Sequence, residues 1–236
     1  MKKYLSEFFG AFILVFAGCG AIVVNELYGG ALSHVGVALV WGMVVMVLIY
    51  SLGDVSGAHF NPAVTIGFIV AGRTKAYKTL ANYIVWQVLG ALAAAYLLKL
   101  LFPLSETLGA TLPADSVWRA FAMEVVLTFI LFFVIMQTTT GAKEKGIMAG
   151  VAIGSAVGID AMFGGPVSGA SMNPARSIGP AIASGHIEHL WVYIAAPLLG
   201  ALLAAPSCLL LRGRECCISE DDLSEEGCKE KEKSNG

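Results

Sequence analysis

Two twelve-residue segments of the sequence carry almost the same pattern of polar side chains. Residues 56–67 read SGAHFNPAVTIG and residues 168–179 read SGASMNPARSIG, with identical residues at eight of the twelve positions. Both contain an Asn-Pro-Ala box, and only the second box is followed by an arginine, Arg176; the boxes are Asn61, Pro62, Ala63 and Asn173, Pro174, Ala175. Asparagine amides and the guanidinium group donate hydrogen bonds, so these residues could hold the oxygen of a passing polar molecule.

Each box is expected to begin a short helix. Proline suits the first helical position, and asparagine is a preferred N-cap, so we predict half-helices over residues 61–71 and 173–183. Ten helical residues are about 15 Å long, half of a bilayer core of about 30 Å. Non-helical backbone at that depth is tolerated where it is buried or lines a water-filled cavity. We therefore expect two re-entrant half-helices whose N-termini meet near the middle of the membrane.

The meeting of two helix N-termini has an electrostatic consequence. Each N-terminus carries roughly half an elementary positive charge, which opposes cations and hydronium. A neutral hydroxylated molecule is not repelled, and it can accept hydrogen bonds from the Asn61 and Asn173 amides. The physical interpretation is a pore for uncharged solutes.

The rest of the chain is apolar enough to surround such a pore with membrane-spanning helices. Hydrophobic residues make up 57% of it and charged residues 14%, whereas soluble domains have about 25% charged residues. Six long apolar runs each have the length of a membrane span; they cover residues 4–24, 35–52, 80–98, 120–137, 146–163 and 190–211. The net charge of −2 and the absence of a basic stripe exclude nucleic acid as a partner.

The distribution of basic residues predicts the orientation. With the N-terminus in the cytoplasm, most of the basic residues fall inside: Lys2, Lys3, Arg73, Lys75, Lys78, Lys143, Lys145, Arg212 and Arg214. The outer loops then hold Arg119 alone, apart from Arg176, as the positive-inside rule expects. We predict a multi-pass protein of the cell membrane with both termini in the cytoplasm.

The chain also reads as two related halves, residues 1–112 and 113–212. Each half opens with a glutamate inside an apolar helix, Glu7 and Glu124, and then runs through a second span into its box, a half-helix and a third span. Three spans per half is an odd number, so the halves insert with opposite orientation, and the working site of such inverted repeats lies near the midplane. Residues 213–236 are charged and poor in apolar residues, which predicts a disordered cytoplasmic tail; no role is assigned to its Cys216, Cys217 and Cys228.

Twin Asn-Pro-Ala boxes in an inverted six-span repeat resemble the aquaporin (major intrinsic protein) family, over about residues 4–212. The resemblance implies an all-α membrane fold with six transmembrane helices and two re-entrant half-helices. It also implies a homotetramer in the lipid bilayer, with one pore per subunit that passes water or small neutral solutes and excludes protons. The stretch GGPVSGASMNPARS is most similar to the nodulin-26-like intrinsic proteins and their bacterial relatives.

The same resemblance identifies a selectivity ring near the outer mouth, formed by Trp41, Ala161, Ala170 and Arg176. Water-selective members have histidine where this chain has Ala161, and the family's glycerol facilitators have aspartate where it has Ser177. Tyr193 and Ile194 occupy positions where water channels commonly have paired aromatic residues. A ring with one indole wall, two alanines and one guanidinium should be wide and amphipathic, suiting glycerol-like polyols and metalloid acids as well as water.

Several other polar residues have two interpretations each. The symmetric placement of Glu7 and Glu124 favours a structural role, in which they accept N–H bonds from the loops that carry the boxes. His59 is expected either to line the inner pore or to contact loop backbone. Asp160 is expected either at the outer vestibule or in a helix cap or helix–helix hydrogen bond. No cluster of His, Cys, Asp and Glu has ligand spacing, so we expect no metal ion and no cofactor.

The sequence therefore predicts a passive channel for water and small uncharged solutes. A strictly water-selective channel is the alternative. A secondary transporter would also use inverted repeats and broken helices, but it would need a coupling-ion site, and the acids within the spans have no basic partner. No nucleophile elbow, metalloprotease motif or paired-carboxylate pattern is present, so an enzyme is not expected.

Overall fold

The computed structural model describes residues 1–73, 77–139 and 143–212, and the regular structure within them is helical. Six of the described helices are long and apolar enough to cross a membrane. These are α1 (Lys2–Leu27), α2 (Ser33–Ser56), α4 (Tyr77–Leu101), α5 (Val117–Thr138), α6 (Lys143–Ser168) and α8 (Val192–Arg212). The predicted all-α membrane fold is confirmed, while the predicted tail, 213–236, lies outside the described residues.

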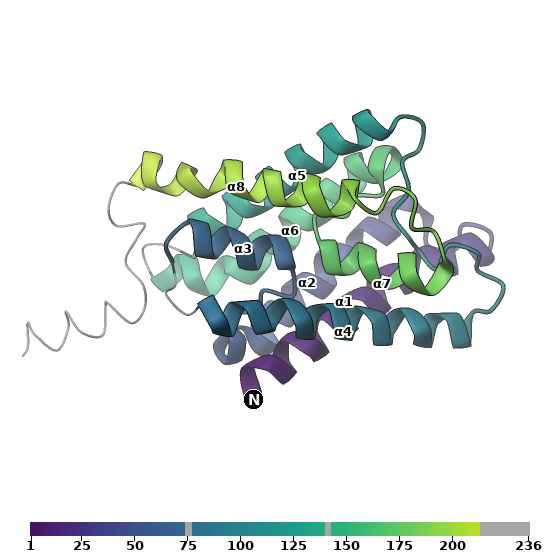
Figure 1. The fold of residues 1–236 in the computed structure, drawn as a ribbon, viewed down its shortest axis with the longest axis horizontal. Coiled ribbons are helices and arrows are strands. Elements are labelled where there is room, and N and C mark those ends of the chain that lie inside the picture. Colours follow the sequence, from purple (N-terminus) through teal and green to yellow (C-terminus); the bar gives the residue numbers. More distant parts are fainter. Residues whose placement is uncertain (74–76, 140–142, 213–236) are drawn as a thin grey trace, which may run out of the picture.

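Two short helices complete the described fold, and both begin where the sequence predicts. α3 (Pro62–Val70) and α7 (Pro174–Ser184) each start with proline at the first helical position and with asparagine as N-cap. Figure 1 shows them in line with one another, α3 toward one end of the molecule and α7 toward the other, with their N-termini at the middle. Neither is long enough to cross a bilayer alone, because nine or eleven residues span at most about 17 Å.

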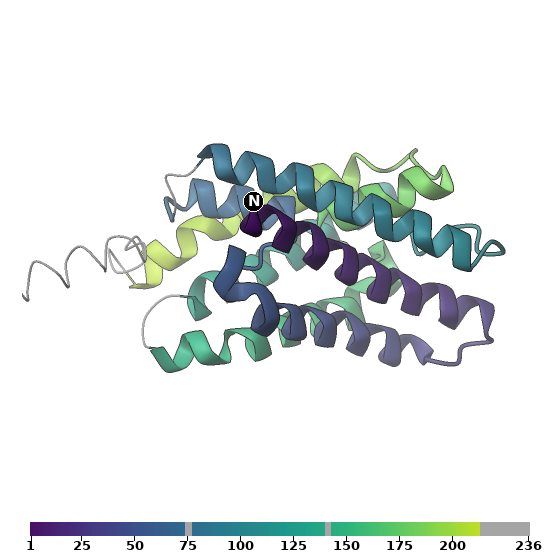
Figure 2. The ribbon, with the colours of Figure 1, turned by 90° about the horizontal axis from the view of Figure 1, so that it is seen from below.

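The two halves of the chain interlock through these short helices. α3, from the first half, packs against α8 of the second half, and α7 packs against α4 of the first half. The long helices run roughly along the same axis of the molecule (Figures 1 and 2), with α1 between α2 and α4, and α5 between α6 and α8. Each half-helix therefore takes one of its walls from the opposite half, which fixes the two boxes relative to each other.

The halves also meet directly along α2 and α6. A Cβ atom added at Gly42 would lie 2.7 Å from the Gly154 carbonyl oxygen, and one added at Gly154 would lie 2.6 Å from the Gly42 carbonyl oxygen. Glycine at both positions lets the two backbones approach as closely as small residues permit in membrane helix pairs. This contact holds α2 and α6 directly against each other.

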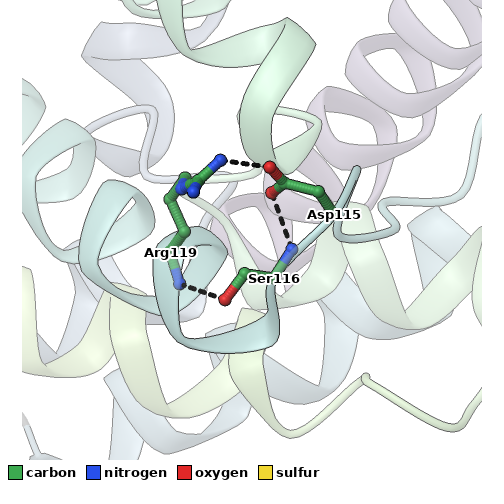
Figure 3. Close-up of polar contacts among 3 residues, drawn as sticks. All are labelled: Asp115, Ser116 and Arg119. Atoms are coloured by element: carbon green, nitrogen blue, oxygen red, sulfur yellow. Dashed lines mark hydrogen bonds and ion pairs between the residues drawn. The ribbon is translucent and has the colours of Figure 1, made fainter.

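The second half begins with a well-capped helix, α5. The Ser116 hydroxyl accepts a hydrogen bond from the Arg119 backbone N–H at 3.4 Å, and the Asp115 carboxylate forms an ion pair with the Arg119 side chain (Figure 3). Serine is a preferred N-cap, so α5 starts at Val117 and holds Glu124 at a fixed depth two turns further on.

Candidate functional site

The two box asparagines hold the N-termini of α3 and α7 against each other. The Asn61 side-chain oxygen accepts hydrogen bonds from the Ala63 and Val64 backbone N–H groups, at 2.8 and 3.4 Å. Its amide nitrogen donates to the Met172 carbonyl at 2.8 Å. Asn173 repeats the arrangement: its oxygen caps α7, and its amide nitrogen donates to the Phe60 carbonyl at 2.9 Å. Each amide has two N–H groups, so one remains for a solute.

The loops before the boxes adopt a backbone that side chains rarely tolerate. In these two loops four non-glycine residues have φ between +43° and +54°, in two pairs that the 112-residue repeat relates: Ala58 and Phe60, Ala170 and Met172. Left-handed backbone costs about 1–2 kcal/mol per residue, so the loops need support from outside.

Glu7 supplies that support in the first half. Its fully buried carboxyl group accepts hydrogen bonds from the His59 and Phe60 backbone N–H groups, at 3.1 and 2.7 Å. The Ser56 hydroxyl and the Gln87 amide also donate to it, at 2.6 and 2.7 Å. An anchor on α1 thus sets the path of the loop from α2 into α3.

Glu124 does the same in the second half. Its carboxyl group accepts from the Ser171 and Met172 backbone N–H groups, both at 2.8 Å, and from the Ser168 hydroxyl at 2.7 Å. These contacts agree with the structural role that the symmetric placement of the two glutamates suggests. Since both loops are held by a carboxyl group, the left-handed conformations are determined by buried hydrogen bonds.

Removing one of these donors should loosen the loop measurably. We expect Ser168→Ala to destabilise the fold by about 1–3 kcal/mol, because a hydrogen bond to a charged or buried group contributes about that much. The measurement is the midpoint temperature of unfolding of the detergent-solubilised protein. Samples are heated, and the folded fraction that remains is measured by size-exclusion chromatography. Ser155→Ala, at an exposed position of the same helix, is the matched control. Equal midpoints for the two variants would contradict the anchoring role.

A cavity of about 120 Å³ lies between the two box loops. Its polar wall comes mainly from the loops and half-helix starts: His59, Asn61, Ser171, Asn173 and Arg176. Its apolar wall comes mainly from α1, α2, α5 and α6: Leu14, Trp41, Val45, Ile49, Leu131, Ile135, Ala149, Ile153 and Val157. A polar strip facing an apolar wall suits a small molecule that carries both hydroxyl groups and carbon.

Arg176 is the one cationic side chain that borders this cavity among the described residues. Its side chain is almost completely buried, and its Nη1 donates to the Gly109 carbonyl at 2.8 Å. Its guanidinium carbon lies 4.7 Å from the centre of the Trp41 ring. Within the described part of the chain it forms no ion pair, so its charge is not cancelled by a carboxylate.

The loop between α4 and α5, residues 102–116, reaches into the site at two points. The Gly109 carbonyl accepts a hydrogen bond from Arg176, and the Thr111 hydroxyl lies 2.8 Å from the Ser177 hydroxyl. Ser177 in turn lies 2.6 Å from the Ser171 hydroxyl. Ser171, Thr111 and Gly109 are functional positions that the sequence analysis does not identify, because their roles depend on contacts with residues distant in sequence.

Ala170 and Trp41 border the cavity with Arg176, but Ala161 lies just beyond it. The cavity residues of α6 end at Val157, and Ala161 follows one turn later, buried on the same helix. The 112-residue spacing of the repeat pairs Trp41, Val45 and Ile49 with Ile153, Val157 and Ala161. Because all three α2 positions border the cavity, the α6 series is expected to continue to Ala161 at the outer end.

His59 borders the cavity and is held on three sides. Its Nδ1 lies 3.1 Å from the Thr65 hydroxyl, and its ring packs against Phe68 and Tyr83, with centroids 4.8 and 5.4 Å away. The ring therefore borders the cavity and contacts a side chain of α3, while a hydrogen bond from the ring to loop backbone is not found among the described residues.

Asp160, Ser177 and Tyr193 do not border the cavity. All three are fully buried, so Asp160 does not lie on a solvent-exposed vestibule wall, which is one of its two expected places. Both Asp160 carboxyl oxygens lack a hydrogen-bond partner among the described residues, which also excludes a helix cap or helix–helix hydrogen bond within them. Ile194, next to Tyr193 on α8, is half-buried and also lies off the cavity.

The arrangement combines positive potential and hydrogen-bond donors with an apolar wall. The N-termini of α3 and α7 and the Arg176 guanidinium place positive potential on the cavity, and helix N-termini alone contribute about half a charge each. No three His, Cys, Asp or Glu side chains come together as metal ligands within the described ranges. A neutral solute would find donors along one wall and hydrocarbon along the other.

Comparison with known proteins agrees with this geometry. A family model described as Major intrinsic protein matches residues 1–207. The chain is 46% identical to Aquaporin NIP3-1 of Arabidopsis thaliana, over 93% of this chain and 70% of that protein. It is 43% identical to Aquaporin NIP1-1 of Zea mays, over 90% and 75%. The X-ray structure of the aquaglyceroporin from Plasmodium falciparum matches its fold with a TM-score of 0.77 at 24% identity, covering 91% of this chain and 98% of that one. With its twin boxes facing across a buried cavity and with matches along nearly its whole length, the chain belongs to the major intrinsic protein family.

Proposed function

We propose that the protein is a passive membrane channel for water and small uncharged solutes. The observation that carries this proposal is the cavity between the N-termini of α3 and α7, where Asn61 and Asn173 each have an N–H group to offer and Arg176 adds a positive charge. Positive potential at that point opposes cations and protons. Neutral molecules with hydroxyl groups are accommodated by the same donors.

The solute range includes three-carbon polyols such as glycerol, and it extends to metalloid acids. The ring of Trp41, Ala161, Ala170 and Arg176 supports this range, because two of its four members contribute only a methyl group. Trp41 adds the apolar carbons of its indole to the cavity wall, and Arg176 offers donors for hydroxyl oxygens. The aquaporin names of the relatives, and the aquaglyceroporin of similar fold, support the same class of solutes.

Stopped-flow light scattering with proteoliposomes tests the proposal. Vesicles are exposed in turn to gradients of an impermeant solute, glycerol, urea and boric acid, and the flux is compared with that of empty vesicles. We expect increased water and glycerol permeability, with flux linear in the gradient and independent of ion gradients. Water flux alone would favour the strictly water-selective channel. Saturable flux coupled to an ion gradient would favour a secondary transporter. We propose no enzymatic activity, since the site lacks an activated nucleophile.

We further propose that the protein is a homotetramer in the cell membrane, with both termini in the cytoplasm. Many large apolar side chains are exposed along the long helices, including Phe9, Val47 and Leu203, so these faces need lipid or neighbouring subunits to cover them. The excess of basic residues in the predicted inner loops supports the orientation.

Cysteine labelling should show the two ends of the molecule on opposite sides of the membrane. In a background with Cys216, Cys217 and Cys228 changed to serine, we expect Lys78→Cys to react with a membrane-impermeant maleimide only from the cytoplasmic face. Ile187→Cys, at a position that is 59% exposed, should react only from outside. Reaction of both from one face would contradict the inverted insertion of the two halves.

A further inference from the structure

Two adjacent residues of α1, Gly18 and Cys19, contact both sides of the outer constriction. A Cβ atom added at Gly18 would lie 2.4–2.5 Å from three carbons of the Trp41 six-membered ring. The indole therefore packs directly on the α1 backbone at Gly18. Any side chain at position 18 would overlap the ring. Gly18 fixes one wall of the ring.

Cys19 contacts the support of the opposite wall. Its fully buried thiol donates to the Gly109 carbonyl oxygen at 3.7 Å. The same carbonyl accepts the Arg176 guanidinium at 2.8 Å. The thiol and the guanidinium thus share one acceptor, which has two lone pairs.

Gly109 is also packed tightly onto the backbone of Cys19. Its φ is +70°, and a Cβ atom added there would lie 3.0 Å from the Cα, Cβ and carbonyl oxygen of Cys19. Two of these three atoms belong to the main chain, so the contact is with the helix itself. Loop 102–116 is therefore seated on α1 at the level of the ring.

We propose that Gly18 and Cys19 form a positioning element, the α1 seat, which sets how far the stacked Trp41 indole and Arg176 guanidinium project into the pore and thereby the solute size that the ring admits. The inference rests on the proposed role of the ring in selectivity. The Trp41 indole packs against Gly18, and the Gly109 carbonyl that accepts the Arg176 hydrogen bond contacts Cys19. Because the guanidinium also lies 4.7 Å from the centre of the indole ring, in cation–π contact, a shift of either group moves the other and changes the opening that the pair leaves to the rest of the ring.

The first test enlarges the seat under the indole. Gly18→Ala should push Trp41 toward the pore and lower glycerol permeability at least about fivefold, the effect of about 1 kcal/mol in the barrier, with a smaller loss for water. Gly20→Ala is the matched control two residues away, because its Cβ would meet only Leu98, at an ordinary 3.4 Å. Equal glycerol-to-water ratios in the two variants would overturn the role of Gly18.

The second test changes the thiol without changing the backbone. Cys19→Ala removes the donor to Gly109 and should raise proton leak through the pore about fivefold, since a hydrogen bond contributes about 1 kcal/mol. Cys19→Ser keeps a hydroxyl donor and should restore the leak of the parent. Identical leak in the alanine and serine variants would show that the thiol does not position Arg176.

A third measurement separates this proposal from the proposed function. Trp41 becomes the sole tryptophan when Trp86, Trp118 and Trp191 are changed to phenylalanine, and its emission then reports on the indole alone. We expect Gly18→Ala to shift the emission of Trp41 and Gly20→Ala to leave it unchanged. If Gly18→Ala shifts the Trp41 emission but the parent passes no glycerol, the positioning role of the α1 seat stands and the wide ring is rejected. If the parent passes glycerol but Gly18→Ala does not shift the Trp41 emission, the proposed channel function stands and the positioning role of the α1 seat is rejected.

Discussion

Replacing Arg176 with valine should open the channel to protons and small cations that the parent excludes. Arg176 is the cationic side chain at the cavity, and within the described residues it has no carboxylate partner. A unit charge about 6 Å from a passing ion contributes about 3 kcal/mol at an effective dielectric constant of 20, so its loss should raise ion flux about a hundredfold. The measurement is conductance across a planar bilayer, together with proton flux into vesicles that contain a pH-sensitive dye.

Two other arginine variants sharpen this prediction. Arg119→Val removes an exposed arginine that is already paired with Asp115, and it should leave ion flux unchanged. Arg176→Lys keeps the charge but replaces the planar guanidinium, so it should retain most of the ion exclusion while altering solute selectivity. Conductance of Arg176→Val equal to that of the parent would remove this residue from the barrier and leave ion exclusion to the helix N-termini.

The parts of the site that follow local rules could be predicted from the sequence. Asn61 and Asn173 cap α3 and α7, as expected from the preference of asparagine for the N-cap and of proline for the first helical position. The six spans follow from hydropathy and length. The roles suggested for Glu7 and Glu124 agree with their contacts. The two acids occupy equivalent helices of the two halves, and each accepts hydrogen bonds from the loop before the box of its own half.

The parts that depend on distant contacts could not be predicted. The Gly109 carbonyl meets Arg176 from 67 positions away, and nothing in the composition of loop 102–116 indicates which residue will point inward. Asp160 was expected at a vestibule or in a hydrogen bond, but its carboxyl group is buried without a partner among the described residues. Helical periodicity predicts on which face of α6 a residue lies. Which residues of other helices that face contacts depends on how α6 packs in the fold.

The two box segments differ in their side chains, and among the described residues the second segment is the one that hydrogen-bonds with loop 102–116. His59 and Thr65 of the first copy correspond to Ser171 and Ser177 of the second, 112 positions later. In the first copy the imidazole reaches the threonine hydroxyl directly, at 3.1 Å. In the second copy two small hydroxyl groups lie 2.6 Å apart, and Ser177 also meets the Thr111 hydroxyl at 2.8 Å. The smaller side chains leave room for loop 102–116, which then reaches Arg176.

Replacing Ala161 with histidine should convert the proposed wide ring into one that favours water. Ala161 contributes a methyl group one turn beyond the last α6 residue that borders the cavity, and Ala170 opposite the indole is also small. An imidazole there would narrow the opening and add a second donor beside Arg176. We expect glycerol permeability to fall at least about tenfold, which corresponds to about 1.4 kcal/mol in the barrier. Water permeability should change much less, because steric exclusion acts on the larger solute first. Both are measured by stopped-flow light scattering on the same vesicles.

The control and a graded variant separate steric narrowing from a general loss of function. Ala31→His makes the same chemical change at an exposed position of the α1–α2 connection, so both permeabilities should match those of the parent. Ala161→Val adds bulk without a donor, and its glycerol permeability should fall between those of the parent and the histidine variant. If Ala161→His lowered water and glycerol in equal proportion, the histidine would be blocking the pore rather than sorting solutes by size. If the parent itself passed no glycerol, the constriction would lie elsewhere and would be narrower than two alanines and one indole allow.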